Sequence, residues 1–330
     1  MIMKLAQIFS SGAVFQAHKP IRIFGTGDEN AEIEFDGEKM TAVAKDGRFC
    51  VEFSPRPYGG PSELIFTYDG SSTVLTDIYV GEVLLLAGQS NIALKLKYTS
   101  YPKEQYENQP LLRIFCGGVY EDEHNFSPDN GWGYCTLENA PDFSAIGYHV
   151  GTELCRRDNI AVGLLACALG STVIESWMPA EIGNRPEFYL PKEEKFESPY
   201  VHGPYNRYGT MYELKQQPLV PYSVGNAVWY QGESNSGPSE HKNYTALLAE
   251  LITCWRRDFC DSSLPFCVVT LADWDARDDA AWHGIQAAQR KIKDVLHNVS
   301  VVEAADVCEK HDIHPPTKIL LAKRILDTVY

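Results

Sequence analysis

The chain has 330 residues, of which 44% are hydrophobic and 22% charged, so it is long enough to bury a core and its composition excludes a disordered protein. Its formal net charge of −15 excludes a general affinity for nucleic acid, although a local arginine can still bind an anionic small molecule. No apolar run approaches the roughly 20 residues of a membrane-spanning helix, so we expect no membrane partner.

The cysteines and the N-terminus indicate a cellular compartment. Nine cysteines are present, an odd number, no CxxC motif occurs, and several lie in apolar runs such as CVVT and LLAC. This pattern favours reduced, buried thiols over a disulfide framework. The first residues, MIMKLAQIFSSGAVFQ, lack a long apolar core with a cleavage site. We therefore expect a cytoplasmic protein, although a secreted chain whose signal peptide had been removed would look the same.

Residues 1–78 carry strand and turn signals without any helical pattern. Ile33 and Phe35 alternate with Glu32 and Glu34, which is the pattern of a half-buried strand. Comparable short β-rich segments are punctuated by Gly and Asp. They are IRIFGTG, AEIEFDG, GRFCVEF and ELIFTYDG. A small N-terminal β-sandwich domain over 1–78 is the prediction.

From residue 79 onward, apolar strands alternate with helical patterns. The strand candidates are 83–87, 160–167, 225–230, 266–271 and 299–304. The helical patterns cover about 239–259, 280–296 and 317–330. This alternation predicts about five parallel strands with helices on both faces, and such sheets carry their chemistry beyond the carboxyl ends of the strands. The stretch 97–139 is weakly patterned and is expected to be loop-rich surface near the site.

The first polar cluster, Gly88-Gln89-Ser90-Asn91, directly follows the strand EVLLLA. A serine at such a strand-to-helix turn is exposed at the edge of the sheet, where it can act as a nucleophile. The turn differs from the GxSxG motif of α/β-hydrolases because Ile92 replaces the second glycine. The alternative interpretation is an ordinary turn with a serine that caps a helix.

Two further polar clusters follow predicted strands. In VWYQGESN, Gln231 and Asn235 carry amides that can donate hydrogen bonds to an oxyanion; the alternative is an ordinary loop. After the strand ending at 167, Gly170 can offer an unhindered backbone N–H. Trp177 follows it and can either form an apolar wall that stacks on a sugar or pack in the core.

The last cluster, KHDIHPP, precedes the final helix and supplies histidines next to an aspartate. Such a pair provides a base and a carboxylate that orients it, whereas the alternative is two surface histidines. A metal site is also conceivable because Cys308, His311, Asp312 and His314 are crowded together. No remote pair with the spacing of zinc ligands completes that set, so we expect no metal.

Taken together, the segments resemble the SGNH hydrolases and, within them, the sialate O-acetylesterase family. AVFQAHKPIRIFGTGD resembles the N-terminal β-domain of that family, and GGPSEL with LTDIYVGEVLLLAGQSN resembles the entry into its catalytic domain. The segments that continue in the family's order are IESWMP, GPYN, PLVPY, VWYQGESN and HDIHPPTK. The resemblance implies a flavodoxin-like three-layer α/β/α SGNH hydrolase domain over 79–330.

The resemblance also implies roles for individual residues. Ser90 is the implied nucleophile and His314 the general base. The oxyanion hole is implied to combine the Ser90 N–H, the Gly170 N–H and the side-chain amide of Gln231 or Asn235.

The acid and the substrate-binding residues are less directly implied. SGNH enzymes usually place an aspartate three residues before the histidine, whereas Asp312 lies two residues before it. The alternatives to Asp312 are Asp306, Glu233 or a backbone carbonyl that leaves a dyad. Arg207, Trp177 and Glu233 are the predicted substrate-binding residues, and Arg207 would contact a substrate carboxylate or simply a surface acid.

The predicted function is a serine esterase that needs no metal or other cofactor and removes O-acetyl groups from a carbohydrate. An O-acetylated sialic acid is the first candidate substrate, followed by acetylated xylan or another plant glycan. Two alternatives from other classes are a non-catalytic carbohydrate-binding protein and a metal-dependent hydrolase built around Cys308. The oligomeric state is left open.

Overall fold

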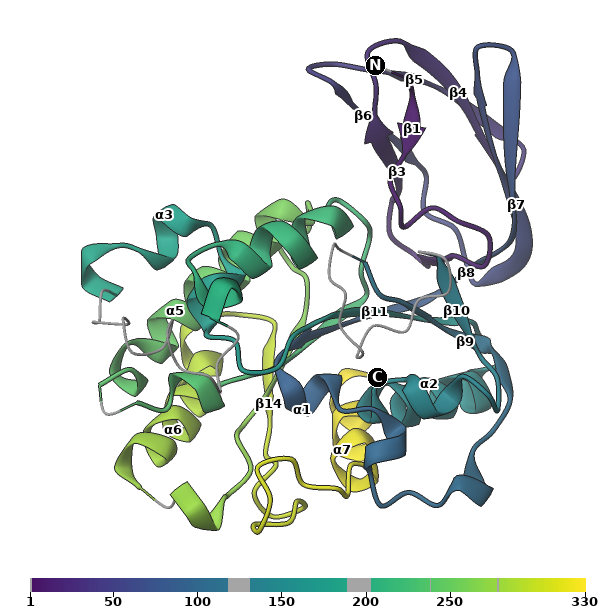
Figure 1. Cartoon of the computed structure of the whole chain (residues 1–330). Coiled ribbons are helices and arrows are strands. Elements are labelled where there is room, and N and C mark those ends of the chain that lie inside the picture. Colours follow the sequence, from purple (N-terminus) through teal and green to yellow (C-terminus); the bar gives the residue numbers. More distant parts are fainter. Residues whose placement is uncertain (1, 118–130, 189–202, 238, 278) are drawn as a thin grey trace.

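The protein has a mixed α/β architecture with one large twisted sheet at its centre and helices packed on that sheet (Figure 1). The computed structural model describes residues 2–117, 131–188, 203–237, 239–277 and 279–330. The central strands run in the order β10-β9-β11-β8-β12-β13-β14. Their bounds are β8 (Ser71–Gly88), β9 (Gln109–Phe115), β10 (Trp132–Cys135), β11 (Val162–Ala168), β12 (Asn226–Tyr230), β13 (Phe266–Val269) and β14 (Val299–Val302). All neighbours are parallel except β10, which pairs with β9 in the antiparallel direction.

The helices pack on this sheet in pairs, with α2 against α7 and α5 against α6. The helices are α1 (Ser90–Ala93), α2 (Ala145–Asp158), α3 (Ala180–Gly183), α5 (His241–Asp258), α6 (Ala280–Val295) and α7 (Ile319–Val329). The apolar stripe that predicts α5 is buried, from Tyr244 to Trp255. Asp279 caps α6 because its side chain accepts hydrogen bonds from two backbone N–H groups of the first turn.

The N-terminal part consists of strands, as its alternating pattern indicates. These are β1 (Lys4–Leu5), β2 (Val14–Gln16), β3 (Ile21–Thr26), β4 (Asn30–Phe35), β5 (Glu38–Val43), β6 (Arg48–Phe53) and β7 (Gly59–Tyr68). β1, β3 and β6 form a separate three-stranded sheet, whereas β4, β5 and β7 continue the large sheet through β8. Phe35 contacts both Phe15 and Phe53 edge-on within the buried interior of this part.

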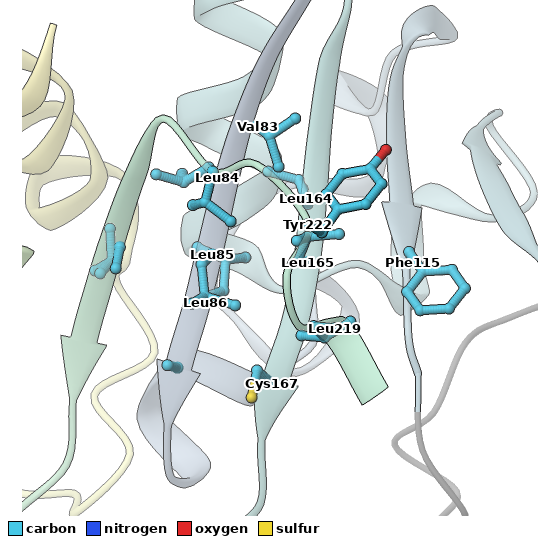
Figure 2. Close-up of a cluster of buried hydrophobic side chains, with 14 of the residues drawn as sticks. Val83, Leu84, Leu85, Leu86, Phe115, Leu164, Leu165, Cys167, Leu219 and Tyr222 are labelled. Carbon is cyan, nitrogen blue, oxygen red and sulfur yellow. The ribbon is translucent and has the colours of Figure 1, made fainter. Parts of the chain in front are cut away.

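β8 joins the two parts of the chain because it runs without interruption across residue 78. Its first half pairs with β7, and its second half pairs with β11 and β12. Val83, Leu84, Leu85 and Leu86 are buried on both faces of the sheet, which explains their continuous apolar run (Figure 2). Each such side chain contributes about 1.5–3 kcal/mol on burial, so packing in the core stabilises the strand that leads to Ser90.

The expected count of about five parallel strands is one short of the six in the described residues. The missing strand is β9, which lies in the stretch predicted to be loop-rich. Its sequence, QPLLRIF, combines a proline with Arg113, so the strand pattern is weak. Arg113 is nevertheless buried, because its guanidinium donates to the backbone carbonyls of Gly12 and Asp77 and pairs with the Asp77 carboxylate at 3.0 Å.

The thiols are unpaired, and none of the nine cysteines forms a disulfide. Six of them are buried, whereas Cys50 and Cys260 are exposed. The prediction of free thiols is therefore confirmed, and that of burial holds for most of them. Among the helices of the described residues, none combines the length and the apolar composition that a membrane crossing requires.

Candidate active site

The predicted polar clusters meet at one edge of the sheet because their strands end in register. Ala168 of β11 and Tyr230 of β12 both lie opposite Gly88, the last residue of β8. Gly88 has a φ of +130°, and a Cβ there would lie 2.2 Å from the Tyr230 carbonyl oxygen, so only glycine fits. The chain then turns into α1, and Ser90 is its first residue.

Ser90 and His314 are in direct contact although 224 positions separate them. His314 Nε2 lies 2.7 Å from Ser90 Oγ, and both side chains are half-buried. Burial lowers the pKa of His314 below its ordinary value of 6.5, the Lys318 charge lowers it further, and Asp312 opposes this shift. The imidazole is therefore neutral near pH 7 and can accept the proton of Ser90.

Asp312 contacts His314 through the backbone rather than through the ring. Its Oδ1 accepts a hydrogen bond from the His314 backbone N–H at 2.8 Å, as in an Asx-turn, and the side chain is exposed. Within the described ranges, no carboxylate hydrogen-bonds to the His314 ring. Because Asp312 lies only two residues before His314, the two residues form a local turn. This turn directs the Asp312 carboxylate to the His314 backbone amide, whereas the sequence predicts it beside the imidazole ring.

The other candidate acids have different partners. Asp306 forms a two-pronged ion pair with Arg324, at 2.6 and 2.9 Å. Glu233 Oε1 accepts a hydrogen bond from Asn91 Nδ2 at 2.6 Å, and its Oε2 is buried without a hydrogen-bond partner among the described residues. Burial raises the pKa of Glu233, and hydrogen bonds, including that from Asn91, oppose the shift. Neither carboxylate hydrogen-bonds to the imidazole in the part of the chain that the structure describes.

Gly170, which the sequence assigns to an oxyanion hole, lies against Ser90. A Cβ at Gly170 would lie 3.3 Å from the Ser90 Cβ, so a larger residue would crowd the serine. Neither the Ser90 N–H nor the Gly170 N–H donates a hydrogen bond within the described residues. Unused backbone donors on Ser90 and on its neighbour Gly170 are the kind of group that a developing oxyanion requires.

The side-chain amides of Gln231 and Asn235 both hydrogen-bond to protein groups in the structure. Gln231 Nε2 donates to the Thr172 carbonyl at 2.9 Å and to Asn235 Oδ1 at 2.8 Å, which uses both of its hydrogens. Asn235 Nδ2 donates to Glu175 at 3.0 Å, and its Oδ1 accepts from the Ile174 N–H. Both side chains are fully buried. Gln231 therefore anchors the loop after Gly170 and has no hydrogen left for an oxyanion, whereas Asn235 keeps one amide hydrogen that no hydrogen bond within the described residues uses.

Asn206, whose role the sequence left unassigned, anchors the same loop. Its Oδ1 accepts from the Val173 N–H at 2.7 Å, and its Nδ2 donates to the Ser171 carbonyl at 2.9 Å. Polar residues that are fully buried need such partners. The only sequence signal for this role is the position of Asn206 in GPYN.

Of the predicted substrate-binding residues, Trp177 is a core residue and Arg207 lies on the surface. Trp177 is fully buried, donates from Nε1 to Thr172 Oγ1 at 2.9 Å and packs edge-on against Trp229. It cannot stack on a sugar without unpacking this core, so the prediction for Trp177 is wrong. Arg207 is exposed and follows the loop anchor Asn206.

The residues of the conceivable metal site are not brought together. His311 Nδ1 lies 2.6 Å from Asp275 on the surface, whereas His314 contacts Ser90. Burial raises the pKa of the Cys308 thiol, which disfavours the thiolate that a metal needs. Across the described part of the chain, no three His, Cys, Asp or Glu side chains are grouped as a metal would require.

A parallel α/β sheet with a serine–histidine pair at its carboxyl edge is an architecture typical of ester hydrolases. The chain belongs to the carbohydrate esterase family of sialic acid-specific acetylesterases, whose family model matches residues 80–327.

Individual relatives agree with this family. The sialate O-acetylesterase of Homo sapiens is 25% identical over 323 residues, which cover 87% of this chain and 61% of that protein. That of Mus musculus is 23% identical over 347 residues, covering 87% and 64%. The chain thus spans less than two thirds of the length of these relatives.

Solved structures share the fold. A carbohydrate acetylesterase from Xanthomonas citri superposes with a TM-score of 0.84 at 26% identity, over 98% of this chain and 74% of the other. A protein from Arabidopsis thaliana is 18% identical, with a TM-score of 0.50, over 76% of this chain and 97% of the other. At that identity, only the fold is shared.

Proposed function

We propose that this protein is a serine esterase that hydrolyses O-acetyl groups on carbohydrates, with Ser90 as the nucleophile and His314 as the general base. The observation that carries the proposal is the 2.7 Å contact between His314 Nε2 and Ser90 Oγ. A nucleophile and its base within hydrogen-bond reach are the signature of covalent catalysis. Membership of the carbohydrate esterase family supports an acetyl ester as the substrate.

The proposed mechanism follows from this pair. His314 Nε2 takes the proton of Ser90 as Oγ attacks the acetyl carbonyl. The oxyanion accepts hydrogen bonds from the Ser90 and Gly170 N–H groups, each worth about 3 kcal/mol. His314 then protonates the departing sugar hydroxyl, and water hydrolyses the acetyl-enzyme with His314 again as the base. No step requires a metal or an organic cofactor.

We expect Asp312→Asn to lower kcat by less than about tenfold, because the amide oxygen of asparagine can still accept from the His314 backbone N–H. An aspartate that orients a histidine ring would instead cost on the order of 10⁴-fold. Steady-state turnover of an aryl acetate measures the difference. Asp306→Asn, which only weakens the ion pair with Arg324, is the matched control. A loss near 10⁴-fold at Asp312 alone would show that Asp312 orients the His314 ring, so that Ser90 and His314 do not act as a dyad.

An O-acetylated sialic acid is the proposed substrate. The family description and the names of the human and mouse relatives support a sialoside, and the Xanthomonas citri structure supports a carbohydrate acetyl ester more generally. Arg207 is exposed, next to the residue that anchors the loop beside Ser90, and a guanidinium can bind the carboxylate of a sialic acid in a two-pronged contact.

Acetate release from matched panels of O-acetylated sialosides and acetylated xylo-oligosaccharides tests this substrate. We expect higher kcat/KM on sialosides, and we expect Arg207→Ala to lower that value by about tenfold or more while sparing neutral aryl acetates. Lys242→Ala, an exposed cation on α5, is the control for lost surface charge. Preference for the xylo-oligosaccharides would identify a plant-glycan esterase, and binding without acetate release would identify a carbohydrate-binding protein.

A further inference from the structure

A buried chain of hydrogen bonds connects the serine turn to the histidine loop. Lys318 Nζ donates to Asn91 Oδ1 at 2.7 Å. Asn91 Nδ2 donates to the Ile313 carbonyl at 2.9 Å and to Glu233 Oε1 at 2.6 Å. Asn91 is 2% exposed and Lys318 is 1% exposed, so water does not compete for these contacts. The mechanism proposed above uses none of these groups directly.

Asn91 couples the two catalytic residues through its place in the chain. It follows Ser90 directly, and the carbonyl that it binds belongs to Ile313, the residue before His314. Its two amide hydrogens and its carbonyl oxygen are all used, so the side chain has a single orientation. Aspartate cannot replace it, because a carboxylate lacks both donors and would repel Glu233.

Lys318 is an unusual residue at this buried position. In the described residues, the hydrogen-bond acceptor of its ammonium group is the neutral Asn91 oxygen, and its Nζ lies 5.8 Å from the centre of the Tyr230 ring. Burial lowers the pKa of Lys318 to about 8. The groups that oppose this shift are Cys308, Glu233, Glu309 and Asp312. Burying a cation without a directly bonded carboxylate costs free energy, so stability alone does not account for this lysine.

We infer that Lys318, acting through Asn91, is a positioning residue that locks the Ser90 turn to the His314 loop. This inference rests on the proposed esterase function. Lys318 fixes the Asn91 oxygen, which leaves the amide hydrogens pointed at Ile313 and Glu233. A displacement of about 1 Å between a nucleophile and its base can cost on the order of 100-fold in rate. The hydrogen bonds of Lys318 and Asn91 therefore affect the chemical step more than substrate binding.

The charge of Lys318 gives the inference a second, independent readout. The charged groups that act on the imidazole are Lys318, at the start of α7, which lowers its pKa, and Asp312, in its own loop, which raises it. Removing the Lys318 cation therefore raises the pKa of His314. Because the unprotonated imidazole is the active form, the acidic limb of the pH profile of kcat/KM moves to higher pH. In the wild type, that limb lies below about pH 6.5.

The test compares Lys318→Met, Asn91→Ala and the double variant with the wild type on an aryl acetate. Each single change is expected to lower kcat by roughly 100-fold with little change in KM. The double variant should lose no more kcat than the worse single variant, since the two residues act as one unit. Lys318→Met should also move the acidic limb upward, whereas Lys318→Arg, which keeps the charge, should leave it near its wild-type position.

Lys19→Met is the matched control for removing a hydrogen-bonded lysine. Lys19 donates to the Val224 carbonyl and to Asp261, each at 2.7 Å, before the amino end of β12 and far from the site. It should leave kcat and the acidic limb unchanged. If circular dichroism shows that Lys318→Met does not fold, Lys318→Arg is used in its place. For this variant we expect a lower kcat and an acidic limb of the pH profile at its wild-type position.

The outcomes separate this inference from the proposed function. Two results would overturn the positioning role while leaving the proposed esterase function intact. One is a loss of kcat in the double variant that equals the sum of the two single losses in free energy. The other is an acidic limb of the pH profile that does not move in Lys318→Met. Ser90→Ala is assayed in parallel, and activity that survives it would reject the esterase mechanism whatever the lysine variants show.

Discussion

Replacing Ser90 with alanine is expected to lower kcat for acetyl-ester hydrolysis by roughly 10⁴- to 10⁶-fold and to leave the fold intact. In the proposed mechanism the Ser90 Oγ forms the acyl-enzyme, and the hydrogen-bond partner of this atom among the described residues is His314. The Ser90 Cβ, which packs near Gly170, remains in the variant. The main loss is therefore chemical, because no packing contact of the side-chain carbon is removed.

Acetate release and circular dichroism, measured on the same preparation, check this result. Ser234→Ala is the matched control, because Ser234 lies at the same edge of the sheet and its backbone N–H still donates to Gln89 Oε1 in the variant. The control should retain activity within a few-fold. If Ser90→Ala turns over the substrate nearly as fast as the control, Ser90 is not the nucleophile. If the wild type is inactive but still binds acetylated sugars, the result favours the carbohydrate-binding alternative.

The sequence predicts most of the sheet from strong local signals, whereas the pairing of Ser90 with His314 is what the family resemblance of its motifs implies. The apolar run that ends at Gly88 predicts a buried strand, and a parallel sheet brings all carboxyl ends to one edge. Gly170 could be predicted for the same reason, since β11 ends in register with β8. β9 could not, because its buried Arg113 is stabilised by Asp77 and by Gly12, a contact far away in the chain.

The direction of each polar side chain is the part that sequence reasoning could not supply. Gln231 and Asn235 lie at the predicted edge, yet their amides turn inward to hold the loop at Thr172 and Ile174. Asp312 turns to a backbone amide because an Asx-turn competes with its ring contact. Lys318 is part of the motif HDIHPPTK, but the sequence does not indicate that its side chain is buried and hydrogen-bonded to Asn91.

The alanine variants of the two histidines in HDIHPPTK should differ in kcat by several orders of magnitude. His314→Ala removes the base of the proposed mechanism, so kcat should fall by roughly 10⁴- to 10⁶-fold. His311 is 90% exposed and faces Asp275 on the surface, and an exposed pair of this kind contributes little to stability. His311→Ala should therefore keep kcat within about twofold of the wild type.

Parallel turnover assays on the two alanine variants decide between the histidines, and each acts as the control for the other. Both substitutions remove an imidazole from the same loop, so a general loosening of that loop would lower both rates alike. The Ser90 contact belongs to His314 alone in the described residues, which predicts a loss confined to the His314 variant. A larger loss at His311 would transfer the role of base to that residue and would require the loop to rearrange when substrate binds.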